Sequence, residues 1–297
     1  MADHRSRFEH WDAAAWVRSK PRRTDAFVPG VHYFSPDLCP ALRHPAVPSY
    51  SRERLLIHHL YLYLEFTVRL ETGPVNEVCL LLRSPDFLPW LDSRMKDDAL
   101  RIYTDEAGHA EMSHTLLASV RDRTGVRPVP HEPHFLRELA ALCSGTGLDP
   151  SLVKLFFVIV SETLITASLN RLPGDSRVQE QVRGLAIDHA ADEGRHYAYF
   201  RELFEHLWPR LDPLVRQRIG VLLPRMMSAF LGTDEPALTA VLADCDVADP
   251  ASVAAEVACA RETLDSIREG ARPTLRMFRR VGMFDDAVIA DAFEELQ

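Results

Sequence analysis

The chain has 297 residues, 46% hydrophobic and 26% charged, a balance that excludes a disordered or low-complexity protein. The net charge of −9 argues against sequence-independent nucleic-acid binding, and only 13 glycines disfavour a turn-rich all-β fold. The five cysteines show no metal or redox spacing, and neither a signal peptide nor a membrane span is evident. We therefore expect a cytoplasmic protein that binds neither nucleic acid nor membrane.

The predicted elements are all helices, because apolar residues recur at helical spacing from Ser51 onward and no strand pair is evident. Residues 1–50 are rich in proline and are expected to form an irregular segment that packs on the core, with 51–297 as a single domain. Four long helices are expected at about 55–83, 92–121, 150–172 and 175–207, the first disturbed at Gly73-Pro74. Shorter flanking helices are expected after His134 and at 211–231, 250–269, 273–281 and 284–295. Four long helices predict a bundle, in whose core carboxylate-bridged metal sites are built.

Two segments share the pattern Asp-Glu-x-x-His, at 105–109 and 192–196. A Glu and a His three residues apart lie on one side of a helix, so Glu106 with His109, and Glu193 with His196, can each reach one metal ion. A third pair, Glu111 and His114, points about 140° away round the helix, which favours a solvated or outer role. The two complete motifs predict a metal centre.

A lone glutamate precedes each motif. Glu162 lies in a helix that is apolar all round, where an uncompensated carboxylate costs several kcal/mol. Counting back similarly from Glu106 reaches Glu71, which continues a core face. Its rivals are Glu65, with Arg69 one turn on, and Glu77, about 120° round the helix and our second choice. Four carboxylates balance two divalent ions, and an oxygen-rich set with imidazoles suits iron or manganese better than zinc.

Three further side chains belong to the predicted centre. His189 lies within about 60° of Glu193 and His196 on one helix face, and we expect it to add a third imidazole to the ion held by these two residues. Asp105 and Asp192 are either surface acids or outer partners that accept the distal N–H of a ligand histidine from the opposite motif.

The set Glu71, Glu106, His109, Glu162, His189, Glu193 and His196 resembles that of the di-iron arylamine N-oxygenases of the p-aminobenzoate N-oxygenase type. The family signature has four Glu and three His, with the third His one turn before the second ExxH glutamate, as at His189. The resemblance implies a ferritin-like four-helix bundle with flanking helices. It also implies two iron ions, replaceable by manganese, with no catalytic residue beyond the cluster.

The implied activity is monooxygenation of an amine, expected to be aromatic, by O₂ to a hydroxylamine, nitroso or nitro product in a biosynthetic pathway such as antibiotic formation. The implied partners are an external electron donor, a small amine that bears a carboxylate or is attached to a carrier, and a second copy of the chain. By the family's pattern Arg268 falls where a carboxylate-binding Arg is expected, and Tyr103 either lines the pocket or packs.

Two other readings share the metal centre. A di-iron oxygenase acting on carbon or on an aliphatic amine differs only in its pocket. A ferroxidase or iron-storage protein of the ferritin type is usually about half this length and has no need of His189.

Overall fold

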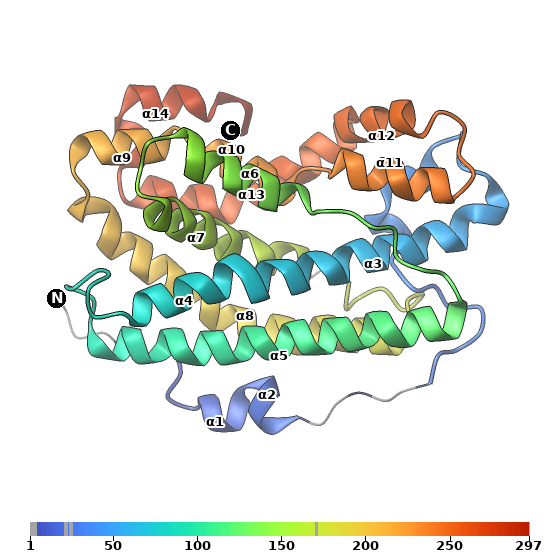
Figure 1. Ribbon diagram of the computed structural model, residues 1–297, viewed down its shortest axis with the longest axis horizontal. Helices are drawn as coiled ribbons and strands as arrows, with labels where there is room; N and C mark the ends of the chain where they lie inside the picture. The colour runs from blue at the N-terminus through green and yellow to red at the C-terminus, as the bar shows by residue number, and fades with distance from the viewer. Residues whose placement is uncertain (1–4, 21–22, 24–25, 170–171, 297) are drawn as a thin grey trace.

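The computed structural model describes residues 5–20, 23, 26–169 and 172–296 (Figure 1). These residues form helices and no β-strand, and their one isolated bridge joins His32 to Val178. The prediction of an all-α, ferritin-like bundle is confirmed.

Four long helical units form the bundle. They are α3 (Arg52–Leu70) continued by α4 (Asn76–Arg83), then α5 (Ser93–Thr124), α7 (Pro150–Leu169) and α8 (Glu180–Leu207). The α3–α4 unit packs along α5, and α7 packs along α8 (Figure 1). Contacts of α5 with α8 and of α4 with α7 close the ring. The two helices that carry the Asp-Glu-x-x-His motifs therefore lie side by side.

The first unit is interrupted by a π-helical turn, Glu71–Val75, as the Gly73-Pro74 pair predicts. Pro74 has no N–H to donate along the helix, and Gly73 leaves the helical region with φ −100° and ψ −110°. A π turn holds one more residue than an α turn, so the faces of α3 and α4 are rotated relative to each other there.

Helices α5 and α7 begin at recognisable caps. The Asp92 carboxylate accepts from Arg94 N at the start of α5, and the Asp149 carboxylate accepts from Ser151 N at the start of α7. Gly125 ends α5 with φ 71°. Helix α8 begins at Glu180, five residues later than predicted, because Asp175 accepts from Ser35 and Arg177 in a turn.

Flanking helices cover the bundle on one side (Figure 1). They are α6 (His134–Gly145), α9 (Pro213–Gly220), α10 (Leu223–Leu231), α11 (Glu235–Asp244), α12 (Pro250–Cys259), α13 (Arg261–Arg280) and α14 (Ala287–Ala292). The single helix predicted for 211–231 is wrong, since it breaks before Pro224. The break predicted before Pro273 is also wrong, since α13 runs through that residue. Helix α11 was not predicted.

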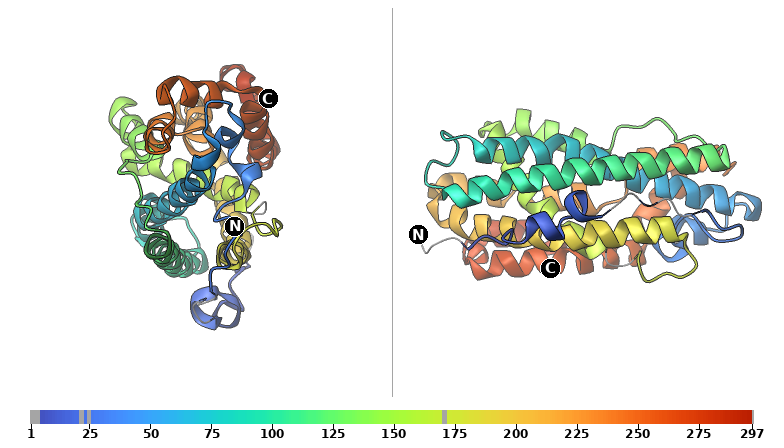
Figure 2. Two further views of the ribbon diagram at one scale, coloured as in Figure 1. Left: turned by 90° about the vertical axis from the view of Figure 1, so that its right-hand side faces the viewer. Right: turned by 90° about the horizontal axis from the view of Figure 1, so that it is seen from below.

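The N-terminal 50 residues are not wholly irregular. They contain α1 (Trp11–Ala14), α2 (Trp16–Ser19) and 3₁₀ turns at Pro36–Leu38, Pro40–Arg43 and Ser49–Ser51. Helix α2 contacts both α5 and α8, and Figure 2 shows this short segment lying across the two helices. None of the described helices is long and apolar enough to cross a membrane.

Two apolar cores lie at the two ends of the bundle and leave a polar layer between them. Along α5, Met95 to Ile102 belong to one core and Met112 to Val120 to the other. Along α8, Val182 to Ala186 belong to the second core and Tyr199 to Leu207 to the first. Both Asp-Glu-x-x-His motifs fall in the gap between the cores, where their charged groups are shielded from solvent.

Candidate metal centre

All seven glutamates and histidines of the predicted set lie in this polar layer. Each is at most 1% exposed. They fall into two groups whose ligand atoms lie within 4.8 Å of one another: Glu71, Glu106, His109, His189 and Glu193 in one group, and Glu106, Glu162, Glu193 and His196 in the other. We call these the His109 group and the His196 group. Glu106 and Glu193 belong to both groups, so they are the two residues able to bridge a pair of ions.

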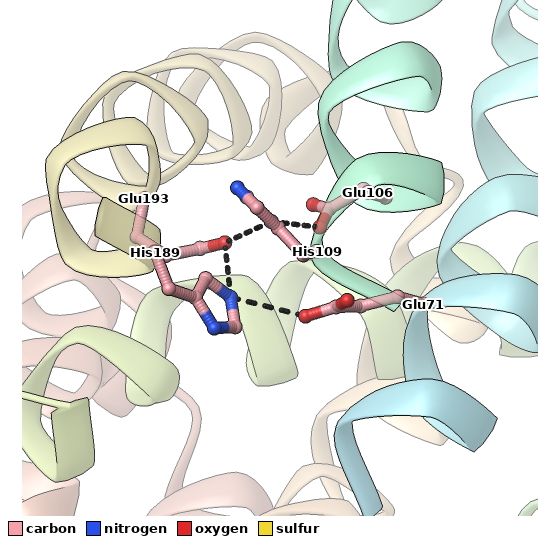
Figure 3. A group of neighbouring side chains, drawn as sticks. All are labelled: Glu71, Glu106, His109, His189 and Glu193. Atoms are coloured by element: carbon pink, nitrogen blue, oxygen red, sulfur yellow. Dashed lines mark hydrogen bonds and ion pairs between the residues drawn. The ribbon is translucent and has the colours of Figure 1, made fainter. Parts of the chain in front are cut away.

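The His109 group draws on three helical units (Figure 3). His189 Nε2 lies 3.0 Å from Glu71 Oε1 and 3.1 Å from Glu193 Oε1. His109 Nδ1 lies 3.0 Å from Glu106 Oε2 and 3.6 Å from Glu193 Oε1. Two imidazole nitrogens and three carboxylates therefore converge on one point.

The His196 group adds the lone glutamate of α7. His196 Nδ1 lies 2.9 Å from Glu106 Oε1, 3.3 Å from Glu193 Oε1 and 3.9 Å from Glu162 Oε2. Each group thus contains one lone glutamate and the histidine of one motif, paired as the order Glu, then Asp-Glu-x-x-His, predicts.

The prediction that His189 shares a metal ion with His196 is wrong. His189 groups with His109 and Glu71, not with His196. His189 and His196 do share a helix face, but seven residues rise about 10 Å along the axis, roughly two turns. Glu193 lies between them in the chain, and both histidines contact its Oε1, His189 Nε2 at 3.1 Å and His196 Nδ1 at 3.3 Å.

Burial and ion pairing decide between the candidate glutamates of the first unit. Glu71 opens the turn and is 1% exposed, whereas the Glu77 carboxylate lies 2.5 Å from Lys154 Nζ near the surface. Glu65 lies 3.3 Å from His131 Nδ1, so its near partner is this histidine rather than the Arg69 expected from the sequence. Of the three, only Glu71 reaches the cluster.

The carboxylates and imidazoles of the cluster shift one another's pKa in opposite directions. Burial, followed by the charges of Glu193 and Glu106, raises the pKa of Glu162 well above its ordinary value. Burial raises the pKa of Glu71 to about 7, although His189 opposes the shift. For His109, burial opposes protonation, but the hydrogen bonds to Asp192 and Glu106 outweigh it and raise the pKa well above normal. Without a metal ion, these raised pKa values mean that the layer holds protons where the ion would bind.

The unsatisfied atoms of the cluster test whether a metal fits. Among the described residues, Glu71 Oε1 and Oε2, Glu106 Oε1, Glu162 Oε2, Glu193 Oε2 and His196 Nδ1 are buried and make no hydrogen bond. His196 Nδ1 and Glu106 Oε1 are 2.9 Å apart and still lack the geometry of a hydrogen bond. Buried acceptors are seldom left unpaired, and atoms aimed at a common centre rather than at each other are those of a metal site.

A family of known proteins matches nearly the whole chain. The sequence profile of the family described as P-aminobenzoate N-oxygenase AurF matches residues 5–282. The chain belongs to this family. Its members are N-oxygenases, so the expectation of an oxidoreductase is confirmed. No individually curated protein matches the chain.

In this member of the p-aminobenzoate N-oxygenase family, the aspartate of each motif contacts the histidine of the opposite motif. His196 Nε2 lies 3.2 Å from Asp105 Oδ2, and His109 Nε2 lies 3.1 Å from Asp192 Oδ2. Both aspartates are fully buried, which excludes the surface-acid alternative. A carboxylate that accepts from Nε2 fixes the ring and leaves Nδ1 directed at the cluster.

Sequence reasoning missed the groups that hold these aspartates. Trp11 Nε1 donates to Asp105 Oδ1 at 2.8 Å, Trp16 N donates to Asp192 Oδ2 at 3.2 Å, and Arg195 Nη2 contacts Asp192 Oδ1. Arg195 lies three residues after Asp192 inside the second motif, and this helical spacing was the available signal. Nothing in the sequence joins the tryptophans to residues 94 and 176 positions away.

The remaining predicted residues lie outside the cluster. Arg268 is exposed on α13, with Nη1 3.4 Å from Asp265 Oδ1, and Tyr103 is half-buried against the apolar core. Glu111 and His114 are exposed, as their helix angle indicates. A Cβ on Gly108 would lie 3.2 Å from Val17 Cβ, so this glycine permits close approach of α2; Gly194 has open space.

A cavity of about 280 Å³ has walls that include His59, Tyr63, Phe66 and His131, and no cluster residue is among its described lining residues. The Tyr63 hydroxyl is buried without a hydrogen bond among the described residues. Burial, and then the charges of Glu71 and Glu193, raise the pKa of Tyr63. Another cavity, of about 360 Å³, lies by Trp16, Met112 and Leu185, and its Asp188 is already paired with Arg23 and Lys20.

Proposed function

We propose that this chain is a non-haem di-iron oxygenase that uses O₂ to oxidise an aromatic amine at nitrogen, through hydroxylamine to nitroso or nitro products. The observation that carries the proposal is the pair of ligand groups sharing Glu106 and Glu193, in a chain of the p-aminobenzoate N-oxygenase family. Bound there, two iron ions would supply the reduction of O₂ and the transfer of oxygen to nitrogen.

The protein's own residues would hold the ions and position the amine. In the proposal Glu71, His109 and His189 bind one ion, Glu162 and His196 bind the other, and Glu106 and Glu193 contact both. Four carboxylates offset the +4 charge of two ferrous ions. Three imidazoles among oxygen donors favour iron or manganese over zinc.

The cavity beside Tyr63 is the proposed substrate site. Its volume of about 280 Å³ and its rings of Tyr63 and Phe66 suit a single aromatic ring. His59 Nδ1 donates to Leu55 O, and burial lowers the pKa of this histidine to about 4, so its Nε2 is a neutral acceptor. Of the described residues that line the cavity, none is a lysine or arginine, and Arg268 is not among them.

The test is turnover by the reconstituted protein. Apo protein is loaded anaerobically with ferrous iron, mixed with a chemical reductant and an arylamine, and exposed to ¹⁸O₂. We expect two irons per chain and ¹⁸O on nitrogen in the product. A panel of p-aminobenzoate, a neutral aniline and an aliphatic amine determines the substrate class. Hydroxylation at carbon, or iron oxidation without any organic product, would overturn the proposal in favour of the other two readings.

The native electron donor and the assembly belong to the same proposal. We expect a separate reductase to deliver the electrons, and a homodimer rather than a large shell, which gel filtration measures.

A further inference from the structure

Residues 6–20 of the chain, here called the strap, cross α5 and α8 on the side away from the flanking helices (Figures 1 and 2). The strap is fastened to four buried acids, each at most 2% exposed. Ser6 Oγ donates to Asp98 at 2.8 Å and Lys20 Nζ donates to Asp188 at 2.7 Å. Between these two bonds lie those of Trp11 to Asp105 and of Trp16 N to Asp192.

The two central bonds differ from the outer two, because their acceptors also hold histidines of the cluster. Asp105 uses Oδ1 for Trp11 Nε1 and Oδ2 for His196 Nε2. With both oxygens engaged, the carboxylate cannot rotate without breaking a bond. Trp11 is thus linked to His196 through one side chain.

We propose that the strap is a positioning element of the metal centre, in which Trp11 holds Asp105 and thereby fixes the ring of His196. The proposal rests on the proposed function only in that the cluster binds metal. It assigns Trp11 to the His196 group and gives it no direct effect on the His109 group.

The packing of the strap is consistent with this role. Phe8 stacks against the His196 ring at a centroid distance of 6.3 Å and lies 5.9 Å from the Arg195 guanidinium carbon. Gly108 lets α2 lie close to α5 one residue before His109. The strap therefore covers the outer side of both motif histidines and excludes water from the aspartates that orient them.

The chain supplies its own control in Trp16. Its indole Nε1 is buried and has no hydrogen bond among the described residues, whereas that of Trp11 is bonded. Trp16→Phe therefore removes an unpaired N–H from the strap, and Trp11→Phe removes the bond to Asp105. Ser6→Ala loosens the strap at Asp98, which holds no histidine of the cluster.

The experiment titrates the full-length apo forms of wild type and these three variants with Co²⁺ against a competing chelator, following the d–d absorption and the melting temperature. Loss of an outer partner typically weakens metal binding 10–100-fold, so losing a bond one step further out should weaken it by about three- to ten-fold. We expect Trp11→Phe to weaken the binding of one of the two Co²⁺ equivalents and to alter the d–d absorption of that ion. Trp16→Phe and Ser6→Ala should bind both equivalents as wild type does.

Wild-type affinity and spectrum in Trp11→Phe would overturn the inference, as would equal weakening in Trp16→Phe or Ser6→Ala, which would mean general loosening. If Trp11→Phe does not fold, Asp105→Asn tests the same link, and undiminished binding of both equivalents there overturns it. A wild-type chain that binds no Co²⁺ would instead overturn the proposed function.

Discussion

The role of His189 can be tested by replacing it with alanine. The side chain is fully buried, with Nε2 3.0 Å from Glu71 and 3.1 Å from Glu193, so truncation removes one of five donors of the His109 group. Loss of an outer partner already costs about 10–100-fold in affinity, or about 1.4–2.7 kcal/mol, and loss of a ligand should reach at least the upper value. The His196 group keeps all four donors. We therefore expect one metal equivalent to weaken by about 100-fold or more and the other to change little.

The assay is equilibrium binding of Fe²⁺ or Co²⁺ to the apo protein, with the melting temperature measured in parallel. His58→Ala is the matched control, because His58 is also fully buried but bonds to Asp244, away from the cluster. Both variants lose packing, so both apo proteins should melt lower than wild type. Only His189→Ala should bind metal more weakly. Two equivalents of wild-type affinity in His189→Ala would refute its assignment as a ligand.

Glu106→Ala should weaken the binding of both metal ions, because Glu106 belongs to both groups, whereas Glu162→Ala should weaken the binding of one. Metal analysis after gel filtration measures this, and two ions retained by Glu106→Ala would contradict it. Removing metal with a chelator should lower the melting temperature, since a ligand at 100 times its Kd adds about 2.7 kcal/mol of stability, and equal melting temperatures would mean that the carboxylates gather no ion. Metal binding at neutral pH should release protons, because burial raises the pKa of Glu71 to about 7 and the pKa of His109 also lies above its normal value. Calorimetry in buffers of different ionisation enthalpy measures this release, and metal affinity should fall as the pH falls.

The sequence indicates the centre well because helical geometry is local. A Glu and a His three apart must share a face, and a carboxylate such as Glu162 in an apolar helix must meet a positive partner. These two rules select five of the seven residues that the structure brings together, and the helix faces of Glu71 and His189 add the other two. Their grouping needs the axial rise as well as the helical angle, which is why the group of His189 was mispredicted.

The boundaries of the flanking helices depend on tertiary contacts. Pro273 predicts a break, yet α13 continues through it, because Thr274, Leu275 and Phe278 are buried and Thr274 bonds to Thr163 of α7. Packing here outweighs the loss of one backbone hydrogen bond. Pro224 behaves as expected of a first-turn proline and begins a new helix, α10.

The strap was invisible to sequence reasoning because its order comes from distant partners. Residues 1–50 have no helical period, and α1 and α2 are four residues each, too short to be stable alone. What orders them is a set of bonds to acids on α5 and α8 more than 90 positions away.

The centre contains two sets of buried acids whose countercharges have different sources. The inner set is the four glutamates, which no lysine or arginine of the described residues contacts and which metal ions or protons can neutralise. The outer set is Asp98, Asp105, Asp188 and Asp192. Asp98 pairs with Arg101, Asp188 pairs with Lys20 and Arg23, and Arg195 pairs with Asp192 and lies 3.9 Å from Asp105. Lys20 and Arg23 come from the N-terminal segment. This segment therefore supplies positive charge to the outer acids, as metal ions would to the inner ones. Because Asp105 joins the two sets, loss of the Trp11 bond to this aspartate should weaken metal binding, while the two apolar cores should keep the fold.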